Sequence, residues 1–347
     1  SACQAGYKAL WNNISGYPSN LFLEKLNNEF SQLTNKLGKE VYPVGTCSGG
    51  LTIEMASRLK LLPGTPVGTA IIDAHSAVAG VGVADPGKMI MVMGTSTCHM
   101  VLDQKEVFTA GVAGVVRDGI IPGYYGYESG QSAVGDIFSW ITEYGVPKSY
   151  HNEAKKSGVS LHELLINKAT SQKAGSHGIV ALDWLNGNRS VLMNSDLKGV
   201  LVGLTLKTKP EDIYRALVEA TAFGTRIIIE AYEENGLNID ELYTCGSLVN
   251  NPLIMQIYSD VTGRPIKVAS SSQATALGAA ILGSVAAGPE YGGYGSYAEA
   301  IKKMTVPVKK TYKPNRENLE IYNKIFVDYK LLHDFFGRDN PSIMKNL

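Results

Sequence analysis

The sequence has no excess of charge of either sign. Lysine and arginine together number 32, and aspartate and glutamate also number 32, with no block of like charges along the chain. A protein that binds the phosphate backbone of a nucleic acid needs a basic surface, so this balance argues against a nucleic acid partner. We therefore expect the partner to be a small molecule or another protein.

The sequence also has few cysteines and histidines, and none of them stands in a metal-binding spacing. The four cysteines lie far apart without a CxxC pair, and the six histidines form no HExxH motif. This pattern argues against a zinc centre or a disulfide framework and favours the reducing cytoplasm. It identifies no metal ligands.

Long apolar runs are absent as well. The most apolar helical stretch, 274–288, is rich in alanine and glycine and is too short to span a bilayer. No signal peptide is visible, and we expect no membrane association. The chain starts with Ser1 rather than methionine and opens inside a helical pattern, so we expect a longer protein to continue in front of it.

What the sequence does contain is an alternation of strand and helix patterns, which is typical of an α/β protein. The uncharged run 89–93 and the residues 98–102 predict a hairpin, and 241–245 and 265–269 predict two further strands. Pro210 and the capping-box spacing of Thr208 and Glu211 mark the start of a long helix. Helices are expected over 20–36, 131–144, 209–234, 250–263, 273–286 and 315–335.

Asp73 is the single carboxylate in the stretch IIDAHSAVAGVG, residues 71–82. One interpretation is a helix N-cap, a position that aspartate favours. The other is a catalytic base at the end of a strand, and these residues alone leave both open. His75, two residues farther on, is interpreted as a helix-surface or hinge histidine rather than a base.

Two short segments could hold an anion or a nucleotide. Gly94, Thr95 and Ser96 form the predicted hairpin tip, where backbone N–H groups and hydroxyls could converge on a phosphate, although an ordinary turn explains them too. Gly246 ends a strand and Asn250 starts a helix, a place where ligands settle in open α/β sheets. The Asn250 amide could pair with an adenine edge, or it could simply cap the helix.

Two glycines inside predicted helices call for different explanations. An interior glycine costs about 1 kcal/mol relative to alanine, so each needs a reason to be there. Gly135 suggests the close approach of another backbone or of a ligand, whereas Gly278 in the alanine-rich helix suggests helix packing.

Several motifs taken together resemble those of the FGGY family of carbohydrate kinases, and within that family those of its L-ribulose kinases. They stand in family order as GTPVGTAIIDAHSAVAGVG, MVMGTST, GYESGQSAVGDIFSW, ALDWLNGNR and CGSLVNNPLIMQIYSDVTGRPI followed by ATALGAAILGSVAAG. The resemblance implies the actin-like ATPase fold, which is ribonuclease H-like. It also implies that 1–83 is the end of a first domain and 84–347 a complete second, nucleotide-binding domain.

The resemblance implies roles for particular residues on the nucleotide side. Thr95, flanked by Gly94 and Ser96, matches a phosphate-binding hairpin. Gly135 matches a nucleotide-contacting glycine, and Gly246 and Asn250 match the adenosine motif.

On the sugar side, Asp73 matches the family's catalytic base, which takes the proton from the attacking hydroxyl. Lys8 and Glu128 fall where L-ribulose kinases are expected to hold sugar hydroxyls. The plainer alternatives are a solvated helix lysine for Lys8 and a loop carboxylate for Glu128.

The expected function is thus the ATP-dependent, Mg²⁺-assisted phosphorylation of a ketopentose, L-ribulose to L-ribulose 5-phosphate, by a cytoplasmic homodimer.

The family's N-terminal domain opens with a phosphate-binding hairpin whose aspartate helps to place Mg²⁺, and no such segment occurs in these residues. The alternative from another class is a non-catalytic actin-like module that binds nucleotide or sugar to regulate or scaffold a partner.

Overall fold

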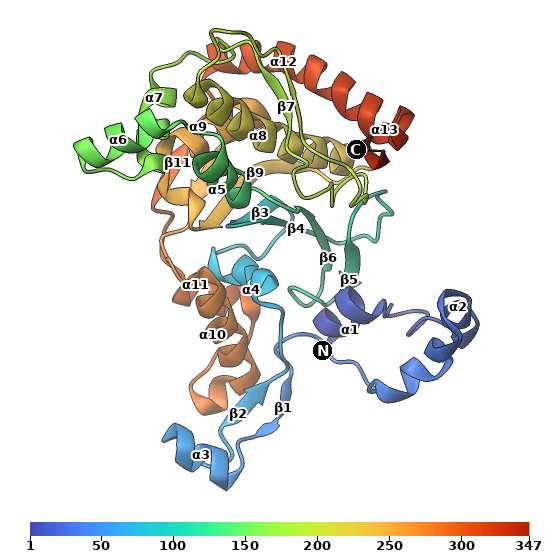
Figure 1. Cartoon of the computed structure of the whole chain (residues 1–347). Helices are drawn as coiled ribbons and strands as arrows, with labels where there is room; N and C mark the ends of the chain where they lie inside the picture. Colours follow the sequence, from blue (N-terminus) through green and yellow to red (C-terminus); the bar gives the residue numbers. More distant parts are fainter. Residues whose placement is uncertain (347) are drawn as a thin grey trace.

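A seven-stranded mixed sheet is the centre of the computed structural model, which describes residues 1–346 (Figure 1). The strand order is β11-β10-β9-β3-β4-β6-β5. The strands are β3 (Gly87–Met93), β4 (Thr97–Asp103), β5 (Gly114–Arg117), β6 (Tyr125–Gln131), β9 (Ile239–Gly246), β10 (Ile266–Val268) and β11 (Lys310–Tyr312). Strands β3, β9 and β10 run parallel, while β3, β4, β6 and β5 pair antiparallel.

The uncharged run in β3 is buried on both faces of the sheet. Met89, Met91 and Met93 belong to one hydrophobic core, and Ile90 between them belongs to the other. This alternation follows the two-residue period of a strand. It explains why the run needs no polar residue and confirms the predicted central strand.

Helices cover both faces of the sheet (Figure 1). The larger core lies under α8 (Pro210–Glu234), α9 (Pro252–Thr262) and α12 (Arg316–Asp334). The smaller core lies under α4 (Asp73–Gly80), α10 (Ala274–Ala287) and α11 (Tyr297–Met304). The expected α/β class is therefore confirmed.

Helices α4 and α10 approach each other so closely that only glycine fits at their contact. A Cβ built on Gly278 would lie 1.7 Å from the backbone oxygen of Ser76, and one built on Gly80 would lie 1.8 Å from that of Ala274. The Ser76 hydroxyl donates across the same contact to the Thr275 oxygen, at 2.8 Å. The predicted packing role of Gly278 is confirmed, and this contact positions the helix that carries Asp73.

Several predicted boundaries are wrong in detail. The helix expected from residue 131 begins at Gly135, because 125–131 form strand β6, so Gly135 is the first helical residue and not an interior one. The range 20–36 divides into α2 (Asn20–Leu26) and the 3-10 helix η1 (Asn28–Lys36). The capping box of α8 is made by Asp212, whose carboxylate accepts from the N–H of Lys209 at 2.8 Å.

The remaining elements lie around this centre. Strands β1 and β2 form a separate antiparallel pair beside α3, and β7 pairs with β8. No helix of the described residues is long and apolar enough to cross a membrane. These elements are α1 (Ala2–Ala9), β1 (Cys47–Gly50), α3 (Ile53–Leu59), β2 (Pro66–Gly68), α5 (Gly135–Tyr144), α6 (Lys148–Ser157), α7 (Leu161–Thr170), β7 (Val180–Leu182), β8 (Val200–Val202), η2 (Leu248–Asn250), η3 (Pro289–Tyr291), η4 (Phe335–Asp339) and α13 (Ser342–Lys345).

Candidate active site

The hairpin tip between β3 and β4 is held from behind by the start of α5. The Gly94 N–H donates to the Ser96 oxygen at 2.9 Å and closes the turn. The N–H groups of Gly135 and Asp136 donate to the oxygens of Gly94 and Thr95, at 3.0 and 3.2 Å. The tip is thus fixed by backbone bonds, while the Thr95 side chain stays exposed.

Gly135 is glycine because the hairpin leaves no room for a side chain. A Cβ at this position would lie 2.6 Å from the Gly94 oxygen. The close approach of another backbone, expected from the sequence, is confirmed.

Replacing Gly135 with alanine should therefore displace the hairpin. The family resemblance assigns this tip to a nucleotide phosphate, so we expect ADP affinity to fall by about tenfold, the size of one lost hydrogen bond to a charged group. Titration calorimetry with ADP measures it. Gly283→Ala in α10, where an added Cβ has nothing within 4 Å, is the control and should change affinity less than about twofold. Unchanged affinity in Gly135→Ala would contradict the assigned role of the hairpin.

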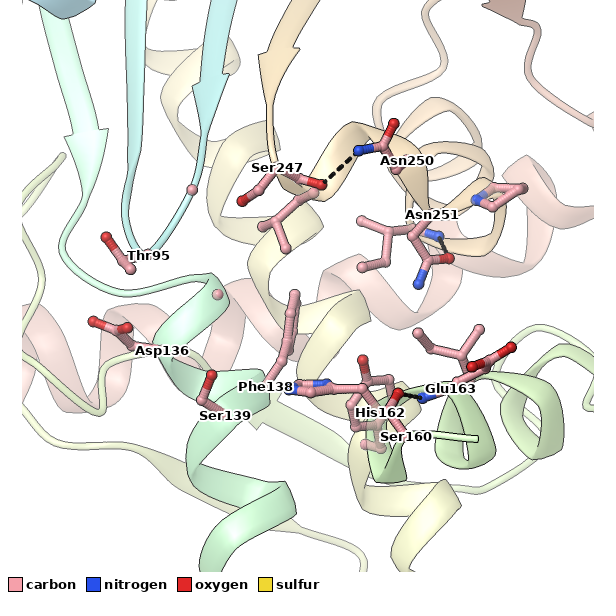
Figure 2. A pocket seen from close by; sticks show the side chains of 17 residues that line it. Thr95, Asp136, Phe138, Ser139, Ser160, His162, Glu163, Ser247, Asn250 and Asn251 are labelled. Carbon is pink, nitrogen blue, oxygen red and sulfur yellow. Dashed lines mark hydrogen bonds between the residues drawn. The ribbon is translucent and has the colours of Figure 1, made fainter. Parts of the chain in front are cut away.

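The second wall of the site stands at the carboxyl end of β9. Asn251 is the N-cap of α9, and its side chain accepts from the N–H groups of Leu253 and Ile254 at 3.0 and 3.3 Å. The capping role considered for Asn250 is therefore wrong. The Asn250 amide is exposed and makes only a long contact of 3.5 Å with the Ser247 oxygen (Figure 2), which leaves it available to a ligand.

These two walls enclose a pocket of about 570 Å³ (Figure 2). Four residues predicted for the nucleotide line it: Gly94, Thr95, Gly135 and Asn250. Ser96 and Gly246 do not. Gly246 has φ +107°, and a Cβ there would lie 2.2 Å from the Met93 oxygen, so the glycine lets β9 end against β3.

The floor of this pocket was not predicted from the sequence. Ser160, His162 and Glu163 come from the start of α7, and Phe138 and Tyr214 come from α5 and α8 (Figure 2). Burial lowers the pKa of His162, so its ring is neutral near pH 7. Apart from Phe138, which lies in the motif GYESGQSAVGDIFSW, these residues belong to none of the motifs above, and only the fold brings them together.

Asp73 is the first residue of α4 and is exposed. The N-cap position belongs to Ile72, so the predicted N-cap is wrong, although one Asp73 carboxylate oxygen accepts from the Ala74 N–H at 2.7 Å. A carboxylate in the first turn is stabilised by the helix dipole. Asp73 lies outside the lining of the 570 Å³ pocket.

Glu128 is a buried strand residue and not the loop carboxylate considered above. It lies in β6 opposite Met100 of β4, three residues from Gln131, which pairs with Thr97 beside the hairpin tip. At about 3.3 Å per residue, Glu128 lies about 10 Å along the strand from that end. Because Tyr127 points into the α8 core, Glu128 points to the α4 side.

The Glu128 carboxylate lies between two nitrogen-bearing side chains. One oxygen is 3.0 Å from His75 Nε2, and the other contacts the Arg189 guanidinium. Burial would raise the pKa of Glu128, but the contact with His75 and the charges of His75, Arg189 and Lys8 outweigh it and lower the pKa to about 2. Glu128 is therefore ionised, and it can act only as a hydrogen-bond acceptor.

Lys8 lies in the last turn of α1, where it is exposed and lines a separate cavity of about 390 Å³. Its charge is the smallest of the contributions that lower the pKa of Glu128, after those of His75 and Arg189. Arg189 also belongs to this cluster, although the sequence predicted no role for it. It lies in the motif ALDWLNGNR, and the resemblance of that motif to the L-ribulose kinases is the signal that could have indicated such a role.

Comparison with known proteins agrees with this geometry. Residues 89–287, more than half of the chain, match the model for "FGGY family of carbohydrate kinases, C-terminal domain". The chain is 54% identical over its whole length to "Ribulokinase" of Geobacillus thermodenitrificans and 45% identical over 99% of its length to that of Mycolicibacterium smegmatis. It spans 62% and 60% of those proteins, respectively.

Solved structures show the same fold. Ligand-bound xylulose kinase from Lactobacillus acidophilus superposes with a TM-score of 0.76 at 17% identity, over 90% of this chain and 61% of the other. The structure of Plasmodium falciparum glycerol kinase with ADP superposes with a TM-score of 0.70 at 18% identity, over 92% of this chain and 60% of the other. The fold is the actin-like fold of carbohydrate kinases, and the chain belongs to the FGGY family of carbohydrate kinases.

Proposed function

We propose that this chain carries the nucleotide site and the catalytic base of an ATP-dependent ketopentose kinase. The reaction transfers the γ-phosphoryl group of MgATP to a terminal hydroxyl of L-ribulose and yields L-ribulose 5-phosphate. The observation that supports it most is the continuity of the site. Glu128 lies on β6, whose last residue pairs with Thr97 beside the tip of the β3–β4 hairpin. Its carboxylate contacts His75 on α4, the helix that carries Asp73. The relatives of 50–54% identity, all named ribulokinase, support the same assignment.

The pocket fits a nucleotide. Thr95 presents its exposed hydroxyl where a phosphate would lie, and the close contact of Gly135 with Gly94 holds the hairpin that carries it. The Asn250 amide can both donate to and accept from an adenine edge. A volume of about 570 Å³ lies within the range of ligand pockets.

Magnesium would neutralise charge on the transferring phosphate when bound. Among residues 1–346, no group of three or more histidine, cysteine, aspartate or glutamate side chains is placed to hold a metal ion. Asp136, exposed in the pocket wall and bonded through its N–H to the hairpin, is the carboxylate of this chain that would approach it.

In the proposed mechanism, the sugar hydroxyl oxygen forms the new bond to phosphorus as the bond to the bridging oxygen of ADP breaks. Asp73 accepts the hydroxyl proton. A carboxylate suffices as the base because positioning contributes most of the catalysis in phosphoryl transfer. Glu128 accepts from a sugar hydroxyl and Lys8 donates to one.

The arrangement of the whole protein is part of the same proposal. We assign 1–83 to the end of a first domain and 84–347 to the second domain. In this proposal, the sugar and the nucleotide bind in a cleft between the two domains. We also propose a cytoplasmic homodimer. No observation favours a non-catalytic module, and the exposed carboxylate of Asp73 at a helix start suits a base.

The test is ADP release by the full-length gene product with MgATP and a panel of L-ribulose, D-xylulose, ribitol and glycerol. We expect L-ribulose to give a kcat/KM at least about tenfold above the others, because unsatisfied hydroxyl contacts cost about 1–3 kcal/mol each. If no sugar or polyol stimulates ADP release, the proposed function is wrong.

A further inference from the structure

His75 is a buried histidine that the proposed mechanism does not use. It is 2% exposed, lies two residues from Asp73 on α4, and so is not the surface or hinge residue that the sequence suggested. A buried imidazole needs partners for both nitrogens, or it loses the hydrogen bonds it makes in water. Its neighbours come from two separate elements, α1 and β6.

Each side of the imidazole ring has a defined neighbour. Nε2 is 3.0 Å from the Glu128 carboxylate on β6, and Nδ1 is 3.6 Å from the Cys3 sulfur on α1. The ring stacks on Tyr7, with centroids 4.3 Å apart and an interplanar angle of 17°. This packing leaves the ring one orientation, with Nε2 directed to Glu128.

Cys3 can set the proton arrangement of His75. Its sulfur is buried and accepts from the Ile72 N–H at 3.4 Å, and burial raises the thiol pKa to about 11. The S–H can therefore donate to Nδ1 of a neutral ring, which puts the ring proton on Nε2. In the cation Nε2 also carries a proton, so in both states the nitrogen that lies 3.0 Å from the Glu128 carboxylate bears an N–H group.

Glu128 retains acceptor capacity for a ligand. A carboxylate offers about four lone-pair sites, and His75 and Arg189 use one on each oxygen. Two sites remain for sugar hydroxyls. The directions of these two lone pairs depend on the orientation of the carboxylate plane, which His75 and Arg189 fix.

We propose that His75 is a positioning residue that fixes the Glu128 carboxylate for the sugar, with Cys3 holding the imidazole so that Nε2 is the donor. This inference rests on the proposed function. It assigns to α4 two tasks, since the helix that presents Asp73 at its start also orients, through His75 two residues later, the carboxylate that binds the sugar.

The test compares His75→Gln, which retains a donor amide, with His75→Leu, which has similar bulk and no donor, in the full-length gene product. We expect His75→Leu to raise the KM for L-ribulose at least about tenfold while the KM for MgATP changes less than about twofold, since the loss of a hydrogen bond to a charged group has this size. His75→Gln should stay within about threefold of the parent protein, because the donor is kept.

His333→Leu is the matched control. His333 is also a buried imidazole beside a carboxylate, that of Asp334 at 3.0 Å, but it packs on Trp184 and does not contact Glu128. Its loss should leave the KM for L-ribulose within about twofold of the parent. Melting curves verify that each variant is folded, and if His75→Leu is not, His75→Asn replaces it because its shorter amide does not reach Glu128.

A double-mutant cycle with Glu128→Gln shows whether His75 acts through Glu128. On that background, His75→Leu should raise the KM by less than about twofold, since contacting residues are not additive. Equal effects of His75→Gln and His75→Leu, or full additivity in the cycle, would overturn the inference and indicate packing alone. If the parent protein shows no turnover with L-ribulose, the proposed function falls and this inference falls with it.

Discussion

Replacing Asp73 with asparagine lowers the kcat for L-ribulose by about 10²- to 10⁴-fold, the usual size of a general-base contribution. Asparagine preserves the size and the local bond to the Ala74 N–H, so the start of α4 stays intact. The amide cannot accept the proton of the sugar hydroxyl. Steady-state ADP release by the full-length gene product measures the change.

Asp85→Asn is the control for this prediction. Asp85 is likewise an exposed aspartate near α4, and its carboxylate pairs with Lys88 at 2.6 Å. A surface pair of this kind contributes about 0–1 kcal/mol, so the variant should keep the parent kcat within about twofold. A kcat for Asp73→Asn within about threefold of the parent would exclude Asp73 as the base.

The largest effect on stability is expected for Gly278→Ala. The added methyl group would stand 1.7 Å from the Ser76 backbone oxygen, so α4 and α10 must move apart. Overpacking of backbone against backbone costs about 3 kcal/mol, at the upper end of the usual range, and a chain of this size should lose about 4 °C in Tm. Because α4 carries Asp73 and His75, kcat should fall as well. Differential scanning calorimetry with activity assays measures both.

Gly283→Ala is the matched control in the same helix. A Cβ at Gly283 has nothing within 4 Å, so the substitution adds helix propensity without a clash. It should raise stability by up to about 1 kcal/mol. A stabilising Gly278→Ala would contradict the close contact of α4 with α10.

The sequence predicted those parts of the fold whose signal is local. The charge-free run of β3 and the long amphipathic pattern of α8 were recognised because one residue type recurs with one period. The hairpin tip and Gly135 were also recognised, since glycine marks backbone contacts wherever it stands. Here the local pattern and the tertiary environment agree.

The sequence failed where a residue's role depends on distant partners. Strand β6 reads as a glycine-rich polar loop, yet it is buried between β4 and β5, so the strand and the burial of Glu128 were missed. His75 appears as a polar residue on a small helix, and its partners Cys3 and Glu128 stand 72 and 53 positions away. The capping role considered for Asn250 belongs to Asn251 for the same reason, because only the helix start decides which of the two asparagines caps.

In the proposed reaction, the bound sugar, and not water, receives the phosphoryl group. Phosphorus-31 NMR of a reaction of the full-length gene product with MgATP and L-ribulose tests it most directly. We expect a new phosphate ester signal that the two protons of a terminal carbon split into a triplet. The amount of this ester should equal the amount of ADP formed. ADP accompanied only by inorganic phosphate, or no ADP at all, would contradict it.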